Sequence, residues 1–294
     1  MKKSGSFCRL NTIVLLFAVL VPGLFTIAAS QEISLNVLSY NIRLINPDDA
    51  PNTWHARKEN VFSAMREAKP DVFGLQEAVY EQVVDMQNSF TGYKRIGVGR
   101  DDGKEAGEYS PVFFNAEKYT MLNSGTFWLS QTPSVPGSRG WDAACNRVVS
   151  WGKLKENKSE IIFFIFCTHF DHMGETARRN SAHLILHAVD SLAGKNPVIV
   201  IGDFNSTPDS EPFRIITDKS NPLHLTDAKV ISKSCSGPKY TFTGFKVGAQ
   251  PGTRIDYIFV KNSVQVGSFT VNETNKGGYY PSDHLPVSAV LKIK

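Results

Sequence analysis

The sequence predicts an α/β (α+β) protein in which two packed β-sheets are covered by helices on their outer faces. About a dozen short segments rich in aliphatic and aromatic residues are bounded by turn residues, which is typical of strands. Three longer segments place apolar residues at helical spacing instead. Because so many strands exceed a comfortable single open sheet, we expect them to divide between two sheets packed face to face.

In the first half of the chain, the predicted strands alternate with two helices. Val61, Met65 and Ala68 lie on one stripe of the first helix, and the same spacing predicts the second. A polar loop at residues 100–110 joins two of the strands. The expected elements are strand 33–41, helix 56–68, strand 72–76, helix 79–90, and strands 93–99, 111–115 and 119–128.

The second half contains the longest predicted helix and the remaining strands. A turn at residues 156–159 separates two apolar runs, which predicts a hairpin. Residues 198–201 form an uninterrupted apolar run, as in a strand buried on both faces. The expected elements are strands 148–154 and 161–168, helix 176–192, and strands 197–201, 256–261, 265–271 and 286–293.

The first 30 residues are interpreted as a signal peptide. Lys2, Lys3 and Arg9 precede a short apolar stretch at residues 13–27 that Pro and Gly interrupt, and small residues predict cleavage after Ser30. An uncleaved N-terminal anchor is the alternative. We expect an exported protein, periplasmic or extracellular, with one domain at residues 31–294 and no transmembrane segment in the mature chain.

Without its leader, the chain is close to electrically neutral. The full chain has 32 Lys and Arg against 28 Asp and Glu, and the leader contains three of the basic residues and none of the acidic ones, which leaves 29 against 28. A neutral chain has no general attraction for nucleic acid. Cys145, Cys167 and Cys235 allow at most one internal disulfide, and Cys167 is expected to be buried because it lies in an apolar run.

Polar side chains stand at the ends of the predicted strands, where ligands gather in sheet proteins. Asp203 and Asn205 follow the apolar run 198–201, and in an extended chain they point to the same side. Such residues are also common at ordinary strand-to-turn junctions. The other strand ends carry Asn41, Glu77, His169, Asp171, Asp256, Asp283 and His284.

Each of these residues also has a structural explanation when it is taken alone. Asn41 can cap a turn, and Glu77 can begin the next helix, whose dipole favours an acidic residue. His169 can be a hydrogen-bonded core histidine, and Asp256 can pair with Arg254. Their common location at the ends of apolar strands favours one shared site.

In their order and their amino-acid sequences, these segments resemble those of the endonuclease/exonuclease/phosphatase superfamily, the DNase I-like metal-dependent phosphodiesterases and phosphatases. The resemblance covers nearly the whole mature chain and implies a four-layer sandwich of two mixed β-sheets. It rests on SYNIR (39–43), GLQE (74–77), THFD (168–171), GDFNSTP (202–208), RIDYIFV (254–260) and SDHLPV (282–287). The segments 99–114, FWLS (127–130) and GWDAACNR (140–147) are similar to a secreted bacterial branch.

The resemblance implies a site for Mg²⁺ or Mn²⁺. Glu77 would be the principal ligand, with Asn41 beside it and Asp283 at the same site. A hard cation with oxygen ligands suits phosphate chemistry because it neutralises charge on the phosphate. The sequence has no Cys cluster or HExxH spacing that would favour zinc.

The resemblance also assigns roles in catalysis. Asp203 and Asn205 would position the attacking water and contact the phosphate. His284, oriented by Asp256, would act on the scissile phosphate, and His169 would donate to a non-bridging oxygen. Such an arrangement aligns a nucleophile and stabilises the charge that develops during phosphate ester cleavage.

Two arginines bear on the choice of substrate. In many DNA-cleaving relatives, an Asp stands at the position of Arg43. The arginine in this chain therefore favours a sugar phosphate, a phospholipid head group or another phosphorylated small molecule as the substrate. Arg147 is a candidate phosphate clamp, because a guanidinium binds phosphate in a bidentate manner. A surface salt bridge is the alternative role for Arg147.

We therefore expect a secreted, divalent-metal-dependent phosphoesterase that cleaves a phosphomonoester or phosphodiester by in-line attack of water. A nuclease is the alternative within the superfamily, but the loop 100–110 has two basic and four acidic residues and would repel a polyanion. A non-catalytic module that binds a phosphorylated ligand is the alternative of another class. All of the predicted catalytic and metal-binding residues are present, which argues against a non-catalytic module. We also expect the protein to be a monomer.

Overall fold

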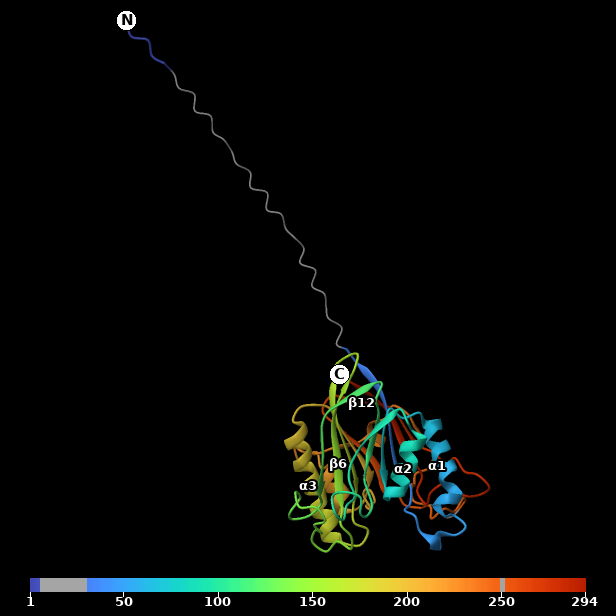
Figure 1. Cartoon of the computed structure of the whole chain (residues 1–294). Coiled ribbons are helices and arrows are strands. Elements are labelled where there is room, and N and C mark those ends of the chain that lie inside the picture. Colours follow the sequence, from blue (N-terminus) through green and yellow to red (C-terminus); the bar gives the residue numbers. More distant parts are fainter. Residues whose placement is uncertain (6–30, 249–251) are drawn as a thin grey trace. The chain divides into compact units, whose positions relative to one another are not determined.

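The computed structural model describes residues 1–5, 31–248 and 252–294. Gln31–Lys294 forms one compact unit (Figure 1). The predicted leader falls largely on residues 6–30, outside the described residues, so its prediction stays untested. Among the residues that are described, no helix is both long and apolar enough to span a membrane.

The first sheet has seven strands within the described residues, in the order β10-β12-β13-β1-β2-β4-β3. Strands β1 and β2 run parallel, whereas β13 is antiparallel to β1, so the sheet is mixed. Its strands are β1 (Ile33–Asn41), β2 (Val72–Gln76), β3 (Tyr93–Ile96), β4 (Val112–Asn115), β10 (Cys235–Ser236), β12 (Val264–Val271) and β13 (Val287–Ile293).

The second sheet has six strands in the described part of the chain, in the order β5-β6-β7-β8-β11-β9. Strands β7 and β8 run parallel, and β11 is antiparallel to β8, so this sheet is also mixed. Its strands are β5 (Tyr119–Trp128), β6 (Val148–Glu156), β7 (Ile162–His169), β8 (Val198–Asp203), β9 (Thr226–Asp227) and β11 (Asp256–Lys261).

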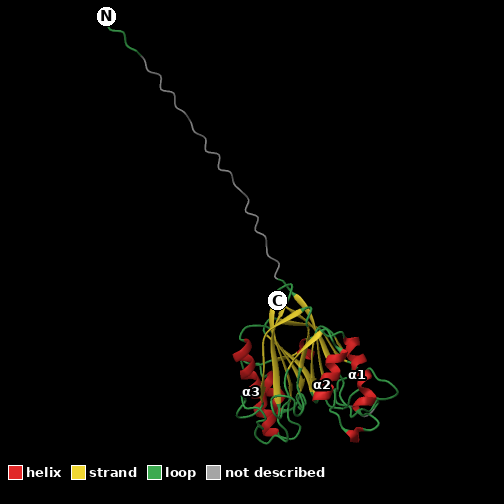
Figure 2. Cartoon of the chain, viewed as in Figure 1, coloured by secondary structure: helices red, strands yellow, loops and turns green. Residues whose placement is uncertain are grey.

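Helices cover the outer faces of the two sheets (Figure 2). Apolar residues of α1 and α2 pack on β1, β2 and β4, and those of α3 and α4 pack on the second sheet. Figure 1 shows α3 on one side of the strands and α1 and α2 on the other. The helices are α1 (Trp54–Ala68), α2 (Tyr80–Ser89), α3 (Glu175–Ala193), α4 (Glu211–Thr217) and α5 (Ala228–Ile231), with a 3₁₀ turn at Pro47–Asp49.

The central core lies between the two sheets, and it contains inward-facing residues of both, such as Leu35 and Ile201. Gly74 of β2 marks a close approach of the sheets: a Cβ there would lie 2.6 Å from both Cys167 Sγ and Ile201 Cδ1. Cys167 is fully buried, as predicted. The layers confirm the predicted sandwich of two packed sheets covered by helices.

Most predicted elements are present with shifts of one to three residues at their ends. Helix α1 begins at Trp54 rather than at residue 56, and β3 ends at Ile96 rather than at residue 99. The sequence patterns did not predict α4, β9, α5 and β10. These elements have two to seven residues each, too few for a periodic pattern to stand out.

The strand directions bring the predicted polar residues to one end of the sandwich. The carboxyl ends of the parallel pair β1 and β2 lie together, as do those of β7 and β8. Because β11 and β13 run the opposite way, their amino ends reach the same edge, and Asp256 pairs directly with Asp203. Six strand ends therefore surround one region.

Candidate active site

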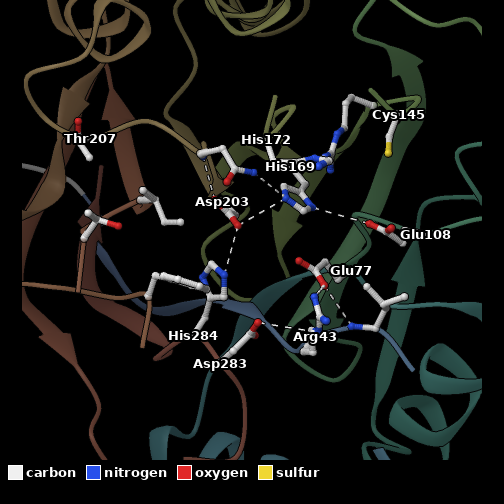
Figure 3. A pocket seen from close by; sticks show the side chains of 16 residues that line it. Arg43, Glu77, Glu108, Cys145, His169, His172, Asp203, Thr207, Asp283 and His284 are labelled. Atoms are coloured by element: carbon white, nitrogen blue, oxygen red, sulfur yellow. Dashed lines mark hydrogen bonds and ion pairs between the residues drawn. The ribbon is translucent and has the colours of Figure 1, made fainter. Parts of the chain in front are cut away.

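A cavity of about 660 Å³ opens at these strand ends (Figure 3). Seven of the nine predicted site residues line it, while Asn41 and Asp256 are fully buried and are not among the lining residues. The lining residues that the sequence predicted are Glu77, Arg147, His169, Asp203, Asn205, Asp283 and His284. The structure thus brings together side chains that are up to about two hundred residues apart in the sequence.

His284 and Asp256 form a buried imidazole–carboxylate pair. Nδ1 of His284 lies 2.9 Å from Oδ2 of Asp256, which holds the ring with Nε2 toward Asp203, 3.7 Å from its Oδ2. Burial alone would lower the pKa of His284, but the Asp256 and Asp203 carboxylates raise it well above its ordinary value. His284 is therefore an imidazolium at neutral pH and can donate a hydrogen bond through Nε2.

Asp203 lies at the centre of the predicted residues (Figure 3). Its Oδ2 accepts a hydrogen bond from Asn41 Nδ2 at 3.0 Å and lies 3.5 Å from Nε2 of His169. Burial and the neighbouring Asp256 carboxylate raise the pKa of Asp203 to about 7. A carboxylate with this pKa can take a proton from water near neutral pH.

His169 is neutral, in contrast to His284. Burial and the positive charges of Arg147 and Arg100 hold the pKa of His169 well below its ordinary value. Its Nε2 lies 3.0 Å from Asn205 Nδ2, and the Asn205 backbone N–H donates to Asp203. His169 and Asn205 therefore form a linked pair that borders the cavity beside Asp203.

Gly202 permits the close approach of β7 and β8 just before these residues. A Cβ at Gly202 would lie 2.2 Å from the Thr168 carbonyl oxygen. Left-handed backbone conformations occur at three residues around the cavity, Glu77, Asn205 and Arg43, with φ of 63°, 44° and 56°. Such conformations are uncommon for residues other than glycine, and they cluster at functional sites.

Glu77 and Asp283 fit a hard divalent cation. Nη1 of Arg43 lies 3.7 Å from Glu77 Oε2, and its Nε lies 3.9 Å from Asp283 Oδ2. Burial raises the pKa of Asp283, and His284 opposes this while the negative charge of Glu77 adds to it. Two carboxylates that converge on one positive charge form an oxygen-rich site, which suits Mg²⁺ or Mn²⁺.

Asn41 orients the carboxylates of this site. Its Nδ2 donates to Glu77 Oε1 at 3.0 Å as well as to Asp203, and its Oδ1 accepts from the Arg43 backbone N–H. The last bond is the turn cap that was the alternative role for Asn41. In this arrangement Glu77 and Asp283 offer the ligand oxygens, and Asn41 links Glu77 to Asp203.

Arg57 of α1 joins the segment that follows Asn41 to the segment that precedes Asp283. Its Nη1 donates to the carbonyls of Ile42 and Pro281 at 2.6 and 3.0 Å, and its Nη2 donates to that of Arg43. Ser282 Oγ adds a bond to the Asn41 carbonyl. No motif in the sequence analysis singled out Arg57, because its partners are backbone carbonyls that only the fold brings near.

Arg147 is buried, so the alternative of a surface salt bridge is wrong. Its side chain is 5% exposed, and its Nε donates to Asp171 Oδ2 at 3.2 Å. Burial would raise the pKa of Asp171, but backbone N–H donors, led by that of Gly174, and the Arg147 charge lower it. The alternative pairing of Asp256 with Arg254 is also wrong, because Arg254 bonds Asp227 at 2.6 Å.

The cavity is also lined by residues that sequence reasoning did not assign to it, among them Glu108, His172 and Phe242. Glu108 is held by Arg100 at 2.7 Å, and burial raises its pKa. His172 contacts Arg147, and the ring of Phe242 packs edge-on against His284. These residues lie in loops, where periodicity carries no signal.

Two groups of three side chains in the described part of the chain bring possible metal-ligand atoms within 4.8 Å of one another. Internal bonds already engage both groups, because His284 bonds Asp256 and Asp171 accepts backbone N–H groups. The oxygen ligands of Glu77 and Asp283 suit a hard cation better. The two groups are Asp203, Asp256 and His284, and Cys145, Asp171 and His172.

Comparison with known proteins identifies the family. A model described as the Endonuclease/Exonuclease/phosphatase family matches residues 34–284. The chain belongs to this family. The match confirms the resemblance that the sequence motifs indicated.

Solved structures of the endonuclease/exonuclease/phosphatase family share the fold. A member from Bacteroides vulgatus is 39% identical with a TM-score of 0.85, covering 89% of this chain and 100% of that one. A mannosyl-6-phosphatase from Bacteroides thetaiotaomicron is 36% identical with a TM-score of 0.81, covering 87% and 99%. These similarities confirm the DNase I-like sandwich.

The chain is also similar to an exoribonuclease subunit. The 3′-5′-exoribonuclease subunit Ccr4 of the CCR4-Not complex from Mycosarcoma maydis is 23% identical over 90% of this chain. The chain spans about half the length of that protein, 51%. This similarity agrees with membership of the endonuclease/exonuclease/phosphatase family.

Proposed function

We propose that the mature protein is an exported, monomeric phosphoesterase that requires Mg²⁺ or Mn²⁺ and hydrolyses a phosphorylated small molecule. The observation that carries this proposal is the placement of Asp203 between His284 and His169. Glu77 and Asp283 line the same cavity. This placement offers a proton acceptor, a cationic donor and oxygen ligands around one point.

The chain's own residues divide the work of phosphate ester hydrolysis. Asp203, whose pKa is raised to about 7, accepts a proton from the attacking water. His284, charged at neutral pH, stabilises the negative charge on the phosphate oxygens, and Asn205 positions the phosphate beside it. A cation held by Glu77 and Asp283 would neutralise further charge on the phosphate.

A small substrate is favoured over nucleic acid by the charges around the cavity. Arg43 bonds Asp49 at 2.9 Å, and Arg100 bonds Glu108, so both cations are neutralised within the protein. The similarity to a mannosyl-6-phosphatase favours a sugar phosphate. A phospholipid head group is the next candidate, because its phosphate offers the same chemistry.

A nuclease is the second candidate function. The similarity to an exoribonuclease subunit over 90% of this chain favours it. A non-catalytic module is less well supported, because seven of the nine predicted site residues line the cavity and the other two, Asn41 and Asp256, bond to lining residues.

The proposal is tested with purified mature protein and a panel of phosphate esters in Mg²⁺ or Mn²⁺. The panel contains sugar phosphates, inositol phosphates, sphingomyelin, p-nitrophenyl phosphate, bis-p-nitrophenyl phosphate, DNA and RNA. We expect hydrolysis of a small ester, loss of activity in EDTA and recovery with either metal. Preferential cleavage of DNA or RNA would establish the nuclease instead, and full activity in EDTA would refute the metal requirement.

Glu77→Gln tests the cation site directly. Loss of the ligand charge should weaken Mn²⁺ binding in a calorimetric titration and reduce turnover by orders of magnitude, with an unchanged melting temperature. Glu59→Gln is the matched control, because Glu59 is exposed on α1. Wild-type Mn²⁺ affinity in Glu77→Gln would remove Glu77 from the site.

A further inference from the structure

Arg147 presents an unpaired donor in the wall of the cavity. Its Nε bonds Asp171, and its Nη2 lies 2.9 Å from Nδ1 of His172. Its Nη1 is buried and has no hydrogen-bond partner among residues 1–5, 31–248 and 252–294. One arm of this buried, charged fork therefore lacks an acceptor among the described residues.

Asp171 keeps this guanidinium in one orientation. The Asp171 carboxylate is 1% exposed and accepts backbone N–H groups from two separate loops, as well as Nε of Arg147. The fork cannot turn to satisfy Nη1 elsewhere without breaking these bonds. The backbone donors belong to Ala144, Cys145, Met173 and Gly174.

A buried cationic N–H without an acceptor is costly, so an oxygen anion that enters the cavity gains a strong contact there. His169 borders the cavity in the same region, and the charge of Arg147 acts strongly on its ring. Figure 3 shows His169 and His172 on one side of Asp203 and His284 on the other. Arg147 therefore belongs to the His169 side of the reaction centre.

The wall beside Arg147 is closed. A small void next to it is bordered by buried side chains and by the carboxylate of Glu108, which Arg100 holds. An alcohol group attached to a phosphate oxygen at Arg147 would collide with this wall. The buried residues are Tyr109, Ser110 and Val148, which are 2–3% exposed.

The opposite side of Asp203 is open to solvent. Phe242 is 40% exposed, and its ring lies 5.1 Å from that of His284. Leu44 and Ile255 also line the cavity, so apolar surface is available to the ring of a leaving alcohol. The cavity thus has a closed, cationic end and an open end with apolar side chains.

We propose that Arg147 binds a terminal phosphate oxygen and that the substrate is therefore a phosphomonoester. A monoester has three non-bridging oxygens and close to two negative charges at neutral pH, whereas a diester has two such oxygens and one charge. Only the monoester can place an unsubstituted oxygen at the closed end while its two other unsubstituted oxygens face His284 and the cation site, which leaves Asp203 to the attacking water. This inference rests on the proposed phosphoesterase function.

The test compares p-nitrophenyl phosphate with bis-p-nitrophenyl phosphate in wild type, Arg147→Gln and Arg147→Lys. We expect the wild type to prefer the monoester. Arg147→Gln should lower kcat/KM for the monoester about 100-fold, the loss typical of one charge-stabilising donor, and change the diester rate little. Arg147→Lys should fall between them, because it keeps the charge but not the fork.

A binding measurement separates this inference from the proposed function. Inorganic phosphate should bind the Mn²⁺-loaded wild type more tightly than Arg147→Gln in calorimetry, by about tenfold. Lys118→Gln is the matched control, because it removes one positive charge and an ion pair with Asp71 at the opposite end of β2. Melting temperatures establish whether each variant is folded. If Arg147→Gln does not fold, the titration uses Arg147→Lys in its place.

Equal losses on both esters, or a wild type that prefers the diester, would overturn the monoester inference. If the wild type hydrolyses neither ester nor any other phosphate ester, the proposed function fails. The phosphate titration then still decides on Arg147: weaker binding by the variant supports the anion site, and unchanged binding overturns it.

Discussion

His284 and His169 stand on either side of Asp203, and their neighbours give them opposite protonation. Carboxylates surround His284 and raise its pKa, whereas burial and two arginines lower that of His169. Residue type alone does not distinguish the two rings. The distances of 2.9 Å from His284 to Asp256 and 3.0 Å from His169 to Asn205 assign a charged donor to one side and a neutral ring to the other.

The first prediction concerns the pair of His284 and Asp256. His284→Ala should lower kcat by roughly two to four orders of magnitude, because a charge-stabilising donor is lost. Asp256→Asn should cost less, since the ring remains but is held loosely. The double variant should be little worse than His284→Ala, because the two residues act as one unit. Steady-state kinetics that show additive losses would establish independent roles.

The second prediction concerns Asp171 and pH. Because its folded pKa lies below the ordinary value, Asp171 stabilises the fold above its unfolded pKa, and this stability is lost as pH falls through the folded pKa. Asp171→Asn should lower the free energy of unfolding by about 3 kcal/mol at pH 7, as for a broken buried ion pair. The difference from wild type should shrink as pH falls below about 4.

Urea unfolding at pH 7, 4 and 2 measures this effect, with Glu59→Gln as an exposed control. A destabilisation by Asp171→Asn that is the same at all three pH values would show that shape, and not charge, makes Asp171 important.

At the scale of elements, strand direction explains why the site forms where it does. Parallel pairs in each sheet place their carboxyl ends at one edge, and antiparallel β11 and β13 bring their amino ends there. Rigid strands then hold Asp203 and Asp256 in direct register. The close approach at Gly74 lets β2 pack tightly against the second sheet, just before Glu77.

Gly74→Ala tests this contact between the sheets. Its Cβ would lie 2.6 Å from Cys167 Sγ, so the sheets must separate or side chains must move, at a cost of about 1–3 kcal/mol. We expect a lower melting temperature and reduced activity, because Glu77 follows the same strand. Gly92→Ala is the control, since no described atom lies within 4 Å of its added Cβ. Equal melting temperatures for both variants would show that the contact adapts without cost.

At the scale of the whole molecule, the predicted leader would determine where the protein acts. We expect the exported protein to begin near Gln31, because the basic start, apolar stretch and small residues match a cleaved signal peptide. N-terminal sequencing of protein recovered outside the cytoplasm checks this. A protein that begins at Met1 would contradict cleavage.

The sequence by itself determined the two-sheet sandwich, the long elements and the set of polar residues at strand ends. Long apolar runs such as Val198–Ile201 carry this information locally, since burial on both faces demands apolar residues throughout. The sequence motifs then indicated the family. Short elements such as α4 were not predicted, because seven residues are too few for a periodic pattern to stand out.

Only the tertiary structure decided how these residues act on one another. Arg147 is buried and bonded on only part of its guanidinium because the loop after β7 brings Asp171 and His172 to it. Arg57 links two distant parts of the chain, because it donates hydrogen bonds to the carbonyls of Ile42 and Pro281, which are more than two hundred residues apart. Distances, burial and the resulting pKa values depend on neighbours that the chain brings together only when it folds.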